Sequence, residues 1–225
     1  SNNEIVMPAG IFVIPGFRDE DIDDAVIYGY AAASTIGHEI THGFDDEGRQ
    51  FDDKGNLQNW WQDEDEKKFN EKAQKYIDQF NNYVVLDSMH INGKATLGEN
   101  IADLGGLVIA LDAFKKTTQY KEGKLIDGLT PLQRYFLGYA LGWLGHQRDE
   151  ELATRVLTDV HSPAFLRVNG PFSNIDDSFE AFGINPLFMY VLGAVLAIII
   201  GNIILYPGGE KTSLKGFIYN DLLQP

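Results

Sequence analysis

The sequence contains no cysteine, and this absence excludes two kinds of site before any motif is considered. Without thiols the chain can form neither disulfides nor thiolate metal sites, so a metal ion would have to be held by histidine, aspartate or glutamate. The absence of cysteine fits the cytosol and does not exclude the bacterial periplasm. We favour a bacterial periplasm or cell envelope, with the cytoplasm as the alternative. The first residues show no basic and apolar leader, so we expect no signal peptide there.

Basic residues are also scarce, with 18 Lys and Arg against 33 Asp and Glu, for a net charge of −15. Nucleic acid is therefore not an expected partner, because phosphate binding needs clustered Lys and Arg. The charge is unevenly spread, since residues 185–225 hold two acidic and two basic side chains that cancel. We therefore predict one domain over residues 1–184 and a separate apolar segment over residues 185–225.

Within that segment, residues 187–206 carry no charged side chain at all. A helix of this length would span about 30 Å, which is the thickness of the hydrocarbon layer of a membrane. We expect a membrane contact or span here, and the alternative is a buried core helix.

The rest of the chain has the apolar spacing and capping residues of helices. These patterns predict helices over residues 28–42, 63–86, 97–116 and 130–146, the last opened by a capping box of Thr130 and Gln133. Residues 4–14 are expected to be extended, and residues 159–172 to form a loop. The predicted fold class is mainly α with a small β element.

The most informative motif is His38-Glu39-Ile40-Thr41-His42. Histidines four apart lie on one helix face and can present two imidazole nitrogens to a single Zn²⁺. The intervening glutamate would lie beside the metal, where it can take a proton from water activated by zinc. The motif suggests hydrolysis of a peptide bond, and the alternative is a helix whose histidines are ordinary polar positions.

A catalytic zinc keeps three protein ligands and one open position, so a third ligand must come from another element. Glu99 and Asp103 are four apart on a predicted helix and can face the same side. Glu99 could bind the metal while Asp103 accepts the N–H of a ligating imidazole. The alternative is a solvated acidic helix face.

Beyond these residues, the chain from Asn3 to Phe182 resembles the C-terminal catalytic part of the neprilysin and endothelin-converting-enzyme family of zinc metallopeptidases. The residues that carry the resemblance are Pro8 to Ile11, Ile36 to Asp46, Asn56-Leu57, Trp60-Trp61, Asn92-Gly93, Thr96 to Asp103, Asp159 to Pro163, Arg167 and Gly170. It implies a thermolysin-like zinc metallopeptidase catalytic domain.

The resemblance also implies the roles of particular residues. It makes His38, His42 and Glu99 the ligands of one Zn²⁺ per chain, and Glu39 the general base. Asp45 and Asp103 would orient the ligating histidines. In addition, His161 would stabilise the tetrahedral intermediate, and Arg167 would contact a backbone carbonyl of the substrate.

The implied activity is that of an endopeptidase that hydrolyses oligopeptides before large apolar residues. Ile11 and Trp143 fall where the family lines the corresponding pocket, although core packing is the alternative for both. Gly142 stands where a larger aliphatic side chain is usual.

Two departures from the family pattern give rise to further expectations. The family's larger N-terminal part, with its substrate-aligning Asn-Ala strand, would lie upstream of Ser1, so we expect a fragment or a shortened relative that requires the missing half. An inactive zinc-binding fragment and a membrane-tethered fusion are the alternatives to an active enzyme. Residues 185–225 also faintly resemble a segment of bacterial membrane acyltransferases, without implying that activity.

Overall fold

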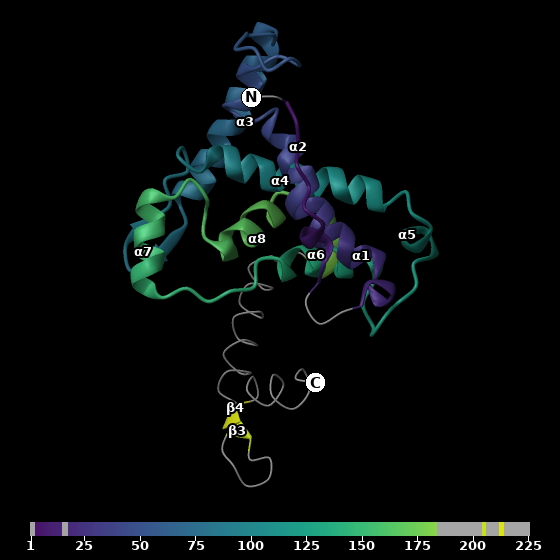
Figure 1. The fold of residues 1–225 in the computed structure, drawn as a ribbon. Coiled ribbons are helices and arrows are strands. Elements are labelled where there is room, and N and C mark those ends of the chain that lie inside the picture. Colours follow the sequence, from purple (N-terminus) through teal and green to yellow (C-terminus); the bar gives the residue numbers. More distant parts are fainter. Residues whose placement is uncertain (1–2, 15–17, 184–203, 206–211, 214–225) are drawn as a thin grey trace.

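The computed structural model describes residues 3–14, 18–183, 204–205 and 212–213 (Figure 1). This part of the chain is mainly helical, as predicted, with two small two-stranded sheets. Its helices are η1 (Ala9–Phe12), η2 (Asp19–Asp21), α1 (Asp24–Ile27), η3 (Tyr28–Gly37), α2 (His38–His42), η4 (Gly48–Gln50), α3 (Asp63–Asn81), α4 (Leu97–Phe114), α5 (Thr118–Glu122), α6 (Pro131–Leu141), α7 (Asp149–Thr158), α8 (Ala164–Phe172) and α9 (Asp176–Phe182).

The helix predicted over residues 28–42 is present, but it begins earlier and is not a regular α-helix. α1, η3 and α2 follow one another without a break, and the side chain of Asp23 caps the start by accepting the N–H of Ala25. The central part, η3, is a π-helix of ten residues. π-helical turns are rare and often occur next to functional sites. Here the π-helical part leads directly into the His-Glu-x-x-His motif.

Small residues let this helix approach α4 closely, and Figure 1 shows α4 crossing it. A Cβ built on Gly106 of α4 would lie 2.4 Å from the carbonyl oxygen of Ala33, and one built on Gly37 would lie 2.8 Å from the Cα of Gly106. Both positions therefore require glycine. The close crossing brings the histidine helix against the first turns of α4.

Two apolar clusters pack around α4, which contributes residues to both. One lies among η3, α4 and α6, and its buried members are Ala25, Ala33, Leu107, Ala110, Leu111, Phe114, Leu132, Tyr135, Phe136, Tyr139 and Ile175. The other joins α4 to α3 and α8, and its buried members are Ala73, Tyr76, Ile77, Phe80, Ile91, Leu97 and Leu166. The first turn of α4, at Leu97, is thereby packed into the second cluster, and the half of the helix from Leu107 to Phe114 into the first.

The first of the two sheets replaces the end of a helix that was predicted over residues 63–86. α3 ends at Asn81, and β1 (Val84–Leu86) pairs antiparallel with β2 (Met89–His90). Valine is favoured in strands, and Asp87 adopts a left-handed φ of 47° that reverses the chain. The helical prediction was therefore wrong after residue 81.

Three other predictions need correction. The helix predicted over residues 130–146 opens with the expected capping box but ends at Leu141. The predicted loop over residues 159–172 contains α8. Its two prolines stand at the N-cap (Pro163) and in the last turn (Pro171), so neither interrupts the helix. The expected extended stretch over residues 4–14 contains the 3₁₀ turn η1 and no strand.

Most of the C-terminal segment lies outside the described residues, and with it the predicted apolar stretch over 187–206. Of that stretch only β3 (Ile204–Leu205) is described, and it pairs with β4 (Thr212–Ser213). Among the helices that the structure describes, none combines the length and apolar character needed to cross a membrane. The boundary between 184 and 185 and the membrane contact stay predictions.

Candidate metal centre and catalytic groove

Three side chains predicted as metal ligands meet where α2 crosses α4. The Nε2 atoms of His38 and His42 lie 3.1 Å apart. The Glu99 carboxylate faces both, with Oε2 3.3 Å from His38 Nε2 and Oε1 3.5 Å from His42 Nε2. One ligand atom from each of the three lies within 4.8 Å of the others, so this set can hold a metal ion.

The donor chemistry of this set fits Zn²⁺. A carboxylate accepts hydrogen bonds, so each imidazole donates its Nδ1–H to its aspartate and leaves the Nε2 lone pair facing inward. Two lone pairs at 3.1 Å repel each other unless a proton or a metal ion lies between them. A tetrahedral zinc with bonds of about 2.0–2.1 Å would hold two nitrogens about 3.3 Å apart. The spacing, the two imidazoles and the carboxylate therefore suit this ion.

Each ligating histidine is held by an aspartate, as predicted for Asp45 and Asp103. His38 Nδ1 lies 2.9 Å from Asp103 Oδ1, and His42 Nδ1 lies 2.7 Å from Asp45 Oδ2. The other oxygen of Asp45 accepts the backbone N–H groups of Glu47 and Gly48. Such partners fix the ring orientation and raise the basicity of a ligand.

The same contacts shift the pKa values of the site. Burial opposes a charge on His38, but its hydrogen bonds to Asp103 and Glu99 outweigh burial and raise the pKa of His38 to about 9. The hydrogen bond to Asp45 raises the pKa of His42 against the effect of burial. Burial also opposes a charge on Glu99, yet the neighbouring His38 and His161 lower its pKa. In the metal-free chain, the cluster thus attracts positive charge.

Arg167 comes from α8 and extends the site beneath His38. Its Nε and Nη2 atoms donate to the two oxygens of Asp103 at 2.7 and 2.8 Å, and its Nη2 lies 3.5 Å from Glu99 Oε2. The guanidinium also stacks on Trp143, with its carbon 4.0 Å from the ring centre. Arg167 is buried, and its predicted contact with a substrate carbonyl stays a prediction.

His161 also contacts Glu99, from the short link between α7 and α8. Its Nε2 is 3.2 Å from Glu99 Oε2, and its Nδ1 donates to Asp159 Oδ1 at 2.7 Å. Asp159 also receives two hydrogen bonds from Arg155, one turn earlier on α7. The imidazole is therefore held with Nε2 toward the metal cluster, by which we mean the three side chains of His38, His42 and Glu99.

Glu39 lies in a groove of about 1100 Å³ that also contains His42. Aromatic side chains line it, among them Phe44 and Trp60, together with the backbone segment 3–7. Glu39 is exposed, one residue after the buried His38. The Glu39 side chain is therefore open to the groove that His42 also lines.

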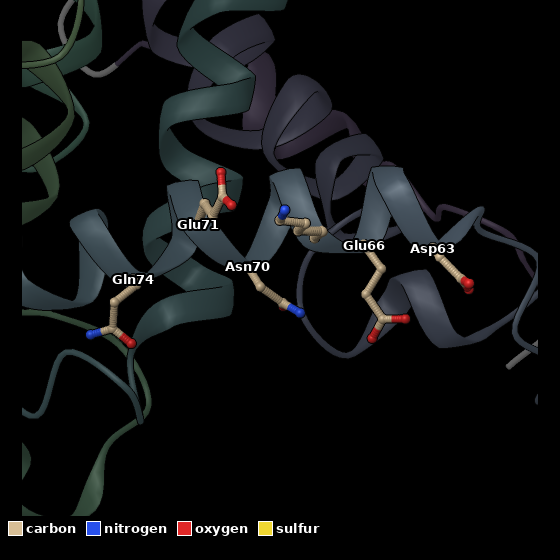
Figure 2. Close-up of a pocket in the computed structure, with 6 residues that line it drawn as sticks. Asp63, Glu66, Asn70, Glu71 and Gln74 are labelled. Atoms are coloured by element: carbon tan, nitrogen blue, oxygen red, sulfur yellow. The ribbon is translucent and has the colours of Figure 1, made fainter.

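A second hollow lies on the exposed surface of α3, as Figure 2 shows. Its lining side chains are polar and belong to one helix: Asp63, Glu66, Lys67, Asn70, Glu71 and Gln74. None of them is among the predicted site residues.

The family model of peptidase family M13 matches residues 1–188 of this sequence. The chain belongs to peptidase family M13. Among its relatives, neprilysin-2 of Caenorhabditis elegans is 43% identical over 190 residues, covering 83% of this chain and 26% of that protein. Endothelin-converting enzyme 1 of Rattus norvegicus is 39% identical over 185 residues, covering 81% of this chain and 24% of that protein.

The fold also matches that of solved M13 structures. An inhibitor complex of the zinc metalloprotease ZMP1 from Mycobacterium tuberculosis superposes with a TM-score of 0.74 at 38% identity, covering 82% of this chain and 29% of that one. The predicted family and fold class are thereby confirmed. The chain spans about a quarter of the length of the curated relatives that it matches.

The M13 assignment leaves the two predicted pocket residues as predictions. Ile11 is half-buried in η1, and Trp143 packs beneath Arg167 and against Tyr139. Neither is among the residues that line the groove containing Glu39.

Sequence reasoning assigned no role to Asp159, although it stands two residues before His161. Its carboxylate accepts both the backbone N–H and the imidazole N–H of His161. Aspartate side chains commonly accept the backbone N–H of the residue two positions later, whatever that residue is. The spacing of Asp159 and His161 alone would therefore not reveal this role.

Proposed function

We propose that this chain is the catalytic part of a zinc-dependent endopeptidase that hydrolyses oligopeptides. The observation that carries the proposal is the position of Glu99, whose carboxylate contacts the Nε2 atoms of His38, His42 and His161. A purely structural metal site would not need an aspartate-held histidine beside the ligands or an open groove containing Glu39.

His38, His42 and Glu99 would hold the zinc. When bound, the ion supplies Lewis-acid chemistry, because it polarises a carbonyl and lowers the pKa of water. Glu39 is the group in the groove that can accept a proton from the attacking water and pass it to the leaving amine. His161, oriented by Asp159, presents a donor to the oxygen that gains negative charge.

The proposal extends to the substrate. The lining of the groove by Phe44, Phe51 and Trp60 supports the binding of apolar peptide side chains. Cleavage before large apolar residues is the preference that the family resemblance implies, with Ile11 and Trp143 as its candidate pocket residues.

The test combines metal analysis with hydrolysis of a quenched peptide carrying Phe or Leu after the scissile bond. We expect about one zinc per chain and cleavage that a chelator abolishes. Glu39→Gln should keep the zinc and lower kcat by about a thousandfold or more, because the proton acceptor is lost. Glu71→Gln, which is the same change at an exposed position of α3 outside the groove, is the control and should leave kcat unchanged.

The alternative is a chain that binds zinc without cleaving peptides. Stoichiometric zinc with no hydrolysis across a peptide library would favour it. Recovery of cleavage on adding the N-terminal part of a relative in trans would then assign the inactivity to missing substrate-aligning residues.

A further inference from the structure

Two buried polar side chains, neither of them a predicted site residue, join α4 to the link that carries His161. Asn100 is 1% exposed and Ser162 is 2% exposed. Ser162 Oγ donates to Asn100 Oδ1 at 2.8 Å. Asn100 Nδ2 in turn donates to Thr96 Oγ1 at 2.9 Å, and Thr96 Oγ1 donates to the carbonyl oxygen of Asn92 at 3.2 Å.

The sequence positions of the two residues give this bond its significance. Asn100 directly follows Glu99, and Ser162 directly follows His161. A bond between Asn100 and Ser162 therefore fixes the backbone of one functional residue relative to that of the other. The two functional side chains meet at 3.2 Å, between His161 Nε2 and Glu99 Oε2.

Few other polar contacts could set the distance between His161 and Glu99. Among the described residues, the hydrogen bonds and ion pairs that join residues 159–163 to α4 are the Asn100–Ser162 bond and the His161–Glu99 contact. Asp159 holds the imidazole ring, but its remaining partner is Arg155 of the preceding α7. Asp159 thus fixes the ring within the link and does not fix the link against α4.

Because it is buried, the bond between Asn100 and Ser162 favours one position of the link relative to α4. Both side chains are almost fully removed from water, so displacing the link by a fraction of an ångström would leave a buried donor and acceptor unpaired. An apolar contact at this place would tolerate sliding. A hydrogen bond at 2.8 Å defines the position of the link instead.

We propose that Asn100 and Ser162 act together as a positioning pair that holds His161 in register with Glu99 and the metal cluster. The importance of this register for catalysis rests on the proposed function. Neither residue touches the substrate or the metal in this role, and both act through their sequence neighbours.

The test compares Ser162→Ala with Ser178→Ala. Both serines are buried, and Ser178 Oγ donates to the backbone carbonyls of Phe172, at the end of α8, and Ile175, at the N-cap of α9, with no contact to the site. In the metal-free chain, amide hydrogen exchange of residues 159–162 should become about tenfold faster in Ser162→Ala and should be unchanged in Ser178→Ala. Equal exchange of these amides in the two variants would overturn the proposal.

The zinc-loaded chain supplies the second readout. Ser162→Ala should keep the zinc Kd within about twofold, because His38, His42 and Glu99 remain, and should lower kcat by about ten- to a hundredfold with little change in KM. An active chain in which Ser162→Ala keeps the wild-type kcat would contradict the proposal. If the wild-type chain hydrolyses no peptide, the proposed function fails, and the exchange comparison alone decides the positioning role.

Discussion

At the scale of single residues, Asp103 joins parts of the site that lie far apart in the sequence. Its side chain is fully buried and receives hydrogen bonds from His38 on α2 and from Arg167 on α8. The pairing of Asp103 with His38 could be predicted, because four-residue spacing placed Asp103 beside Glu99. The pairing with Arg167 could not, because nothing in the sequence shows that α8 returns to this helix.

Asp103→Asn should weaken both folding and metal binding. The amide group would face the donors of Arg167 with its own N–H and leave the buried guanidinium with only its longer contact to Glu99, which costs up to about 3–5 kcal/mol. Loss of the partner of His38 should lower zinc affinity about 10–100-fold. Urea unfolding and a zinc titration measure the two effects.

The matched control is Asp112→Asn on the same helix. Asp112 is exposed and pairs only loosely with Lys116, at 3.8 Å. Its substitution should change the free energy of unfolding by less than about 0.5 kcal/mol. Similar losses in the two variants would show that the buried pair has no special importance.

Asp159 gives a prediction about pH. Burial would raise its pKa, but hydrogen bonds from the backbone and imidazole of His161 and from Arg155 outweigh burial and lower the pKa to about 2, against 3.8 in an unfolded chain. A lowered pKa in the folded state means that the stabilisation is fully present above pH 3.8 and is lost as the pH falls toward 2.

Compared with Asp159→Asn, the wild-type chain should therefore be more stable at pH 6 by on the order of 1–2 kcal/mol, allowing for solvent screening. This difference should shrink steadily between pH 4 and pH 2, as followed by denaturant unfolding at each pH. A difference that grows on acidification would have the wrong sign for this mechanism.

At the scale of elements, the existence of most long helices could be predicted from the sequence, whereas their ends and their helix type were predicted less accurately. The helix 97–116 was predicted within two residues of α4, because apolar positions recur along its whole length. The π-helical geometry of η3 was not predictable, since it depends on packing against α4 and α6. α8 lies where a loop was predicted, and its two prolines stand at the N-cap and in the last turn.

The crossing of α4 with the histidine helix yields a prediction at this scale. Gly106→Ala would place a methyl group 2.4 Å from the Ala33 carbonyl and 2.7 Å from the His38 nitrogen, and both atoms belong to the backbone. Because the backbone cannot yield cheaply, the helices must separate. The variant should lose about 2–3 kcal/mol of stability or more and should bind zinc less tightly.

Gly145→Ala is the corresponding control, because a Cβ there would meet no atom within 4 Å. It should leave both the unfolding free energy and the zinc affinity near their wild-type values. A Gly106→Ala chain with unchanged zinc affinity would show that the crossing distance does not set the ligand geometry.

At the scale of the whole molecule, α4 connects the two apolar clusters and carries Glu99, while the histidine ligands come from α2. The motif order in the sequence indicated that these residues share one site. The clusters that hold α4 in place could not be predicted, since their members come from six or more separated segments. A metal that bridges α2 and α4 would thus link helices whose separation requires the core to open.

Zinc should therefore stabilise the entire fold and not only the site. An ion that binds the folded chain alone adds about 2.7 kcal/mol at a free concentration of a hundred times its Kd. Thermal unfolding with buffered zinc and with a chelator measures this shift. Glu39→Gln should keep the full shift, because Glu39 is proposed as a proton acceptor and not as a ligand, whereas Glu99→Gln should lose most of it. If both variants lost it equally, the division of the two glutamates into ligand and base would be wrong.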